Sequence, residues 1–136
     1  MAMHEKLPED EVFNIVEQMP IFCAEECGHI ADPEERKRCS EDAQLGFIYR
    51  HVTYPLEAFE KGTEGTAVVS FVVEKDGTIS NIEVVDDPGD GLGEAALKLV
   101  EKMQTEDVRW VPGTQKGQAV RVRIKMPIQF ELEKNA

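Results

Sequence analysis

The stretch from Ala119 to Leu132 alternates apolar and polar side chains almost without a break, and this pattern constrains the fold more than any other. Its apolar members all occupy even positions: Val120, Val122, Ile124, Met126, Ile128, Phe130 and Leu132. Because successive side chains of a strand point to opposite faces, the pattern predicts one long strand with a buried face and a solvated face. We expect Val122, Ile124 and Phe130 to face the helices of the domain.

The outer face of this predicted strand is basic, because it carries Arg121, Arg123 and Lys125, and Pro127 follows shortly afterwards. Proline has no N–H, which confines it to an edge strand or a bulge. An exposed edge is a template for an added strand unless it is guarded. The three cations either guard that edge or help to hold an acidic extended peptide, and the residues alone leave both interpretations open.

Two helices and a hairpin are predicted upstream. Asp32 can cap a helix over 32–52 that has Pro33 at its first position, and a shorter helix ends at Gly62. The Asp76-Gly77 pair is typical of a turn between two strands. Ile79 is out of phase with the apolar residues that follow it, which predicts a bulge or a register shift.

The remaining local signals complete the expected architecture. Helical spacing over 91–104 gives a buried stripe formed by Leu92, Ala96, Leu99, Val100 and Met103. Trp110, the one tryptophan, is expected to fill the core beneath the loop before the last strand. The order of elements predicts an α+β fold with two layers, in which a three-stranded antiparallel sheet has its helices packed on one face.

The N-terminal third is harder to interpret. Residues 1–11 are polar and are expected to be disordered or extraneous to the domain, and 11–22 form either a short strand or a loose apolar arm. A cysteine-bearing extension over 12–44 contains Cys23, Cys27 and Cys39. These three form one disulfide and a leftover thiol, a zinc site together with His29, or free thiols.

Charge and composition exclude several classes of function. The net charge is −12, and residues 1–60 carry 14 acids against 5 bases. Such an acidic chain is a poor ligand for nucleic acid. No apolar run is long enough to cross a membrane or to serve as a signal peptide, so we expect a cytosolic protein or a soluble piece of a longer one. No nucleophile with a base and no carboxylate pair stands out, so we expect no enzymatic activity, cofactor or metal.

Several motifs together resemble the C-terminal domain of TonB energy transducers. They are Tyr54-Pro55, the Gly65 start of the first strand, the Asp76-Gly77 hairpin, the "EAAL" helix, Trp110-x-Pro112-Gly113, Gly117, and the strand from Val120 to Phe130. The resemblance covers about residues 45–133. It extends more weakly to "VEQMPIF" and "CSEDAQLGFIYRHVTYP", which are similar to the upstream segment of a cysteine-bearing branch of the family.

The resemblance implies a periplasmic domain that is anchored to the inner membrane in the full-length protein. It implies two partners: the TonB box, a short peptide of TonB-dependent outer-membrane transporters, and the inner-membrane proton-channel motor reached through the N-terminal anchor. The domain couples the proton motive force to the transporters by adding the box as a strand beside its last strand. It implies a partner site of Arg121, Val122, Arg123, Ile124 and Lys125, with His51 and Tyr54 contributing, and a dimer is conceivable.

Two further expectations depend on this resemblance. The oxidising setting of the family favours a disulfide that joins Cys39 to Cys23 or Cys27. The alternative function is an interaction or regulatory domain appended to a membrane sensor or peptidase, without transporter coupling.

Overall fold

The structure is a computed structural model that describes residues 10–22 and 24–132. Residues 1–9, 23 and 133–136 lie outside the described part. The expectation of disorder at the N-terminus therefore falls almost entirely outside it, and so does the possible pairing of Cys23. Asp10 and Glu11 are described, and Asp10 already contacts the folded domain through its carbonyl oxygen, which accepts from Arg121 Nη1 at 2.9 Å.

A mixed sheet forms one layer of the molecule, with strand order β1-β5-β2-β3 and with β4 also paired to β5. The strands are β1 Val12–Phe13, β2 Gly65–Val73, β3 Ile79–Asp86, β4 Gly113–Gln115 and β5 Gln118–Phe130. The predicted three-stranded antiparallel sheet is its centre, formed by β5, β2 and β3. Two short strands extend it beyond the predicted count, because the apolar arm supplies β1 and the Pro112-Gly113 loop supplies β4.

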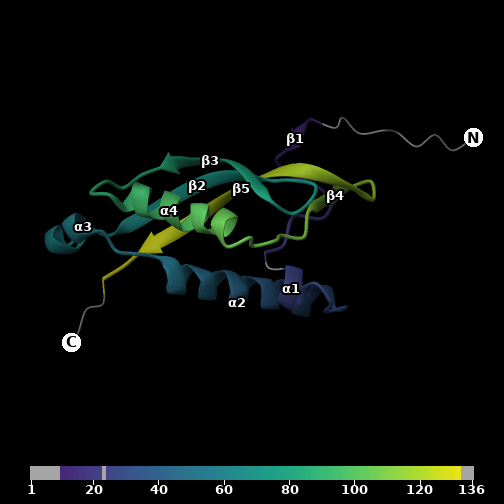
Figure 1. The fold of residues 1–136 in the computed structure, drawn as a ribbon, viewed down its shortest axis with the longest axis horizontal. Coiled ribbons are helices and arrows are strands. Elements are labelled where there is room, and N and C mark those ends of the chain that lie inside the picture. The colour runs from purple at the N-terminus through teal and green to yellow at the C-terminus, as the bar shows by residue number, and fades with distance from the viewer. Residues whose placement is uncertain (1–9, 23, 133–136) are drawn as a thin grey trace, which may run out of the picture.

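Four helices lie in the described part of the chain. They are α1 Ala24–Cys27, α2 Pro33–His51, α3 Leu56–Lys61 and α4 Leu92–Thr105. As predicted, the side chain of Asp32 caps α2 by accepting from the backbone N–H of Glu34 at 2.9 Å, and Gly62 ends α3 in the left-handed conformation with φ 70°. Helix α4 packs across β2 and β3, and α2 runs along the lower side of the sheet with α1 beside it (Figure 1).

The β2–β3 turn requires its glycine. Gly77 has φ 86°, and a Cβ there would lie 2.3 Å from the carbonyl oxygen of Trp110. The backbone N–H of Trp110 in turn donates to the carbonyl of Gly77 at 2.9 Å. Any larger residue would both strain the turn and push away the segment that carries the buried tryptophan.

The two ladders of β2 differ in regularity. Its pairing with β5 keeps one register from Gly65↔Phe130 to Val73↔Val122. Its pairing with β3 shifts register twice, between Val68 and Val69 and between Ser70 and Val72, which confirms the irregularity predicted for β3. The β5–β2 pair is therefore the regular part of the sheet, and β3 is the distorted part.

The main core lies between the sheet and the helices. Trp110 is 5% exposed and makes edge-on contacts with Phe22 and Phe71, so its predicted role in the core is confirmed. Phe130 belongs to this core, as predicted. Val122 does not face the helices as expected. It packs in a smaller cluster against Val16, because the N-terminal arm rather than a helix covers that end of β5.

The part of the arm from residue 17 to residue 22 is held firmly. Gln18 and Thr114 exchange two backbone hydrogen bonds of 3.2 and 2.9 Å, and Ile21 and Val111 exchange two of 3.0 and 2.7 Å. Phe22, only 3% exposed, then inserts into the main core. The arm is thus part of the fold, and residues 17–22 cannot detach without disrupting the core.

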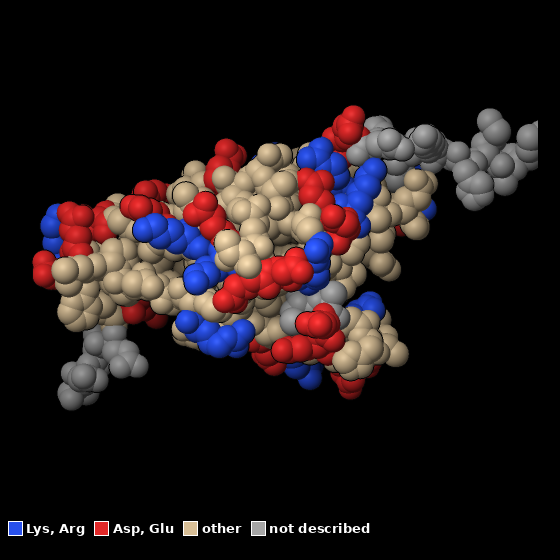
Figure 2. Space-filling model, viewed as in Figure 1, with Lys and Arg blue, Asp and Glu red and all other residues tan. Residues whose placement is uncertain are grey.

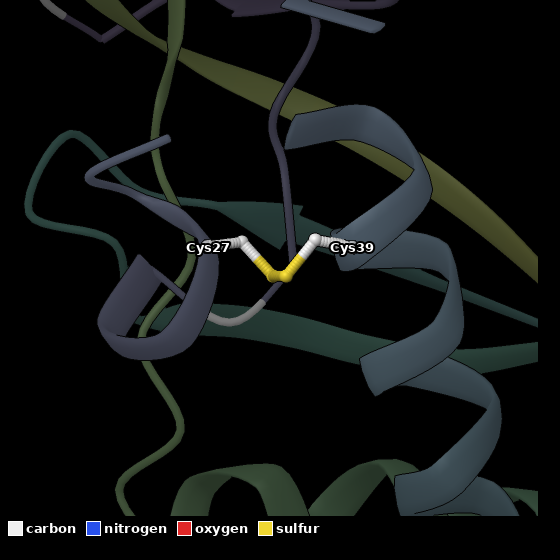
Figure 3. Close-up of a disulfide and its surroundings, with 2 residues drawn as sticks. All are labelled: Cys27 and Cys39. Atoms are coloured by element: carbon white, nitrogen blue, oxygen red, sulfur yellow. A yellow bond between two sulfur atoms is a disulfide. The ribbon is translucent and has the colours of Figure 1, made fainter. Parts of the chain in front are cut away.

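A disulfide joins Cys27 of α1 to Cys39 of α2, with a Cα–Cα distance of 5.7 Å (Figure 3). It is one of the two pairings that the sequence left open. The zinc alternative is wrong, because two of its three thiols are consumed by this bond. Among the described residues, no group of histidine, cysteine and carboxylate side chains could hold a metal ion.

This bond predicts a redox-dependent stability. It closes a loop with a sequence separation of 12, so reduction should lower the free energy of unfolding by about 3 kcal/mol. Urea denaturation with and without dithiothreitol measures the change. The double variant Cys27→Ala/Cys39→Ala should lose the response to reductant, and the matched control Cys23→Ala should keep it. A Cys23→Ala protein that no longer responds would assign the bond to the other pair.

Candidate peptide-binding edge

One edge of strand β5 pairs with β2. The direction of the β5 backbone groups therefore decides which hydrogen-bond donors and acceptors the other edge presents. Pro127 stands opposite Val68 of β2 but has no N–H to donate. A proline is tolerated in a paired strand when its nitrogen faces away from the partner. Because the backbone groups of alternate residues point to the same edge, the odd-numbered residues of β5 direct their N–H and C=O groups away from β2.

The turn between β4 and β5 independently indicates the same alternation of backbone directions along β5. Lys116 and Gly117 both have positive φ, 52° and 74°, which is typical of a two-residue hairpin loop whose flanking residues exchange hydrogen bonds. Those flanking residues are Gln115 and Gln118, so the even-numbered Gln118 directs its backbone groups toward β4. Strand β4 therefore pairs with the same edge of β5 as β2 does. The backbone groups of the odd-numbered residues face the opposite, outer edge.

The outer edge begins under the N-terminal arm. Strand β1 pairs with it in parallel, in the register Val12↔Arg121 and Phe13↔Val122, and it lies beside the first half of β5 (Figure 1). This register places β1 opposite the outward backbone groups of Arg121 and Arg123. Beyond them, none of the described strands covers the outer edge of β5. Its remaining outward N–H groups belong to Lys125 and Gln129, because Pro127 has none.

The opposite edge of the sheet is unsuited to an added strand. Strand β3 carries both register shifts, and Asn81 adopts a left-handed conformation with φ 49°. Glu83 and Asp86 are exposed on the same strand. Bulges and charges of this kind are the usual means of protecting an edge strand from unwanted pairing. The regular edge is that of β5, and β1 covers only part of it.

The three cations of the outer face are in different states. Arg121 is already engaged, since its Nε lies 2.7 Å and its Nη2 3.1 Å from the two carboxylate oxygens of Glu74, and its Nη1 donates to the carbonyl of Asp10. Arg123 Nη1 donates to Ser70 Oγ at 3.1 Å. Lys125 is exposed, and no ion pair forms on it within the described part of the chain. Lys125 is therefore the cation that remains available to a partner.

Glu74 is the anion that fixes this end of the face. The hydrogen bond from Arg121 holds the pKa of the Glu74 carboxyl below its ordinary value, and a hydrogen bond from the Ser80 hydroxyl adds to this effect while partial burial opposes it. The pKa of Arg121 is raised in turn by the same bond. Acidic and basic side chains interleave across the visible face of the molecule (Figure 2), so the field at this edge is local rather than part of one large patch.

His51 and Tyr54 are not brought to this site. His51 Nε2 lies 3.2 Å from Glu106 Oε2, and its ring packs on Phe47. The Tyr54 hydroxyl donates to the carbonyl of Thr63, and its ring packs edge-on against Phe130. Burial, with a smaller contribution from Glu64, raises the pKa of Tyr54. Phe130 lies nine residues after Arg121, or about 30 Å along the strand, so Tyr54 lies at the opposite end of β5 from Arg121.

Sequence reasoning missed two contributors to this edge. Glu74 precedes the hairpin turn with no pattern that links it to Arg121, and only the β2–β5 register brings the two together. The arm was seen as a short strand or a loose segment, but not as a neighbour of β5. Its one signal is the apolar run that contains Val12, Phe13 and Val16.

The C-terminal part of the chain matches a known family of domains. The family described as "Gram-negative bacterial TonB protein C-terminal" matches residues 50–132. The chain belongs to this family. Domains of the TonB C-terminal family are non-enzymatic interaction domains of the periplasm, and they interact with outer-membrane transporters. A comparison with curated proteins gives no match.

Solved structures support the fold. The solution structure of Helicobacter pylori TonB-CTD residues 179–285 is 23% identical, with a TM-score of 0.53, and the alignment covers 82% of this chain and 96% of that one. The structure of residues 194–285 of the same protein is 26% identical, with a TM-score of 0.50 and coverage of 70% and 96%. The α+β fold of the TonB C-terminal domain is thus confirmed, and the arm and β4 are additions to the expected strand count. Within the described residues, no helix is long and apolar enough to cross a membrane.

The Glu74–Arg121 pair predicts a pH-dependent stability. The folded pKa of Glu74 lies below its ordinary value of 4.5, so the pair stabilises the fold above that value and the contribution is lost as the pH falls through the folded pKa. Urea denaturation from neutral pH to about pH 3, below the ordinary carboxyl range, should show that Glu74→Gln loses less stability on acidification than the wild type does. Glu101→Gln, the same change at an exposed glutamate of α4 that forms no ion pair within the described part of the chain, should follow the wild type. Equal pH dependence of the wild type and Glu74→Gln would contradict the assigned pair.

Proposed function

We propose that this domain binds the TonB box of an outer-membrane transporter as an added strand on the outer edge of β5, along Arg121 to Lys125. The observation that carries the proposal is the direction of the backbone groups along β5. Its odd-numbered backbone groups point away from β2, while the other edge of the sheet is blunted by two register shifts. Membership of the TonB C-terminal family supports the class of partner.

The direction of the added strand is part of the proposal. Strand β1 pairs with β5 in parallel, and its register to Arg121 and Val122 shows that this edge accepts a parallel strand. A partner strand in the same direction would continue along Arg123 and Lys125. Main-chain hydrogen bonds would provide most of its affinity, because a strand added to a sheet edge pairs with the backbone of its neighbour.

The basic face contributes orientation more than affinity. Arg121 is already engaged by Glu74, so a partner carboxylate would find Lys125 and, less fully, Arg123. Exposed ion pairs of this kind contribute little to affinity, about 0–1 kcal/mol, and are screened by salt. In the full-length protein, we propose that this contact transmits work from the proton-driven motor of the inner membrane to the transporter.

A backbone substitution tests the proposal better than charge reversal does, because reversing Arg121 would also break its pair with Glu74. Lys125→Pro removes an outward N–H and leaves the ladder to β2 intact, as Pro127 already does two residues later. Lys125→Ala removes the same side chain and keeps the N–H. We expect Lys125→Pro to weaken binding of a synthetic TonB-box peptide about tenfold, the loss of one main-chain hydrogen bond. Lys125→Ala should weaken it about twofold or less, as expected for an exposed charge.

Isothermal titration calorimetry measures both affinities, and urea denaturation checks that each variant is folded. The peptides should come from the N-termini of the transporters encoded in the same genome. Equal weakening by the two variants would show that the Lys125 side chain, and not the strand ladder, makes the contact. Unchanged affinity in both variants would remove β5 from the site.

A further inference from the structure

The N-terminal arm consists of two parts that are held with very different strength. Residues 17–22 exchange four backbone hydrogen bonds with the segment 111–114 and end at the buried Phe22. Residues 10–16 are attached by the two-residue strand β1, one contact from Asp10 to Arg121, and the side chains of Phe13 and Val16. Between β1 and Val16 the chain bends outward at Asn14 and Ile15, and Ile15 is 83% exposed.

The weakly held part occupies the most useful portion of the β5 edge. With β1 in place, the outward N–H groups beyond it are those of Lys125 and Gln129, which Pro127 separates. With β1 removed, the edge would present Arg121, Arg123 and Lys125 as three consecutive outward residues. An added strand needs such a continuous series of donors and acceptors, because its affinity comes from the backbone ladder.

We propose that the segment Asp10–Val16 is a displaceable strand that competes, from within the same chain, with a partner strand for the edge at Arg121 and Arg123. The inference rests on the proposed function. It adds that the segment already paired with the outer edge of β5 must be replaced before a partner strand can bind there. The firm anchor at residues 17–22 keeps the released segment tethered, so displacement leaves the core intact. A tethered strand competes at an effective concentration on the order of millimolar, which sets a threshold that only a well-matched partner strand passes.

We expect a partner strand to share the features with which the arm binds this edge. The arm enters the edge as an extended parallel strand in which Phe13 packs toward Val122 while its neighbour Val12 points to the other side of the sheet. A partner must therefore be an extended segment with apolar residues at alternate positions and no proline where it faces Arg121 and Arg123. We expect one large apolar side chain to replace Phe13 above Val120 and Val122.

Two neighbouring residues of the arm provide a matched pair of variants. Val16 is 7% exposed and packs on Val120 and Val122, whereas Ile15 points into solvent. Val16→Asp should release the segment 10–16, and Ile15→Asp, the same charge introduced one residue earlier, should leave it in place. Val16→Ala serves as a milder version if the charged variant proves unstable.

Amide hydrogen exchange of the full chain reads out the release without any partner. In Val16→Asp, the amides of Arg121 and Arg123, which face the arm, should exchange about tenfold faster or more, the equivalent of 1.4 kcal/mol of lost docking. The amides of Val122 and Ile124, which face β2, should keep their protection and thereby exclude global unfolding. Unchanged exchange at Arg121 and Arg123 in both Val16 variants would overturn the proposal.

A peptide with the sequence of residues 10–18, added in trans, tests competition for the edge. It should bind Val16→Asp about tenfold more tightly or more than it binds the wild type, and its amide shifts should map to Arg121–Lys125. Ile15→Asp should behave as the wild type does. Equal affinities, or no binding to Val16→Asp at millimolar peptide, would overturn the proposal. If dilution of the wild type accelerates exchange at Arg121, the occupant is the arm of a second copy, which would equally overturn competition within one chain.

Because this peptide comes from the chain itself, the result does not depend on whether a transporter box binds. Binding of the peptide in trans without binding of any TonB box would support the displaceable strand and contradict the proposed function. Equal binding of a TonB box to the wild type and to Val16→Asp would support the proposed function and contradict the displaceable strand.

Discussion

The ladder between β5 and β2 is the interaction on which the rest of the structure depends. It runs in one register from Val73↔Val122 to Gly65↔Phe130 and brings most apolar residues of both strands to the main core, while Val122 lies in the smaller cluster. The ladder also fixes the outer edge, since Pro127 can stand in it only with its nitrogen turned away from β2. A single constraint thus orients the core on one face and the candidate binding groups along one edge.

Around this ladder, the N-terminal third is attached in steps of decreasing strength. The Cys27–Cys39 disulfide holds α1 to α2, Phe22 inserts beside Trp110, and backbone pairs hold residues 17–22 to the loop that contains Val111 and Thr114. Only β1 and Val16 remain beyond that point. The firm steps give the domain its stability, and the weak last step lies where a partner strand would add.

Much of the fold could be predicted because its signals are local. The alternation in β5, the Asp76-Gly77 turn and the Asp32 cap each lie within a few residues of the element that they define. The edge could be predicted from Pro127 and the cations. The occupancy of that edge could not, because β1 is two residues long and pairs with a strand at the other end of the chain. For the same reason, no local pattern links Glu74 to Arg121, and nothing local separates Val122, which the arm covers, from its neighbours in the main core.

The resemblance to TonB C-terminal domains implied a partner site at β5, but that site grouped residues that the fold keeps apart. Tyr54 is engaged with Thr63 and Phe130 at the far end of β5, and His51 is engaged with Glu106. Neither side chain shares an environment with Arg121, Arg123 or Lys125. The geometry therefore favours a site defined by the backbone of one strand edge over a site defined by side chains from several elements.

The most direct test of this account places a bound peptide on the sheet. A TonB-box peptide that carries a nitroxide spin label at its C-terminal end broadens the amide signals of nearby residues in the labelled domain. Parallel addition to the outer edge of β5 predicts that Pro127's neighbours, Ile128 and Gln129, broaden most, and that a label at the N-terminal end moves the effect to Arg121. Broadening centred on Glu83 and Val85 of β3, or the reverse order along β5, would contradict the account.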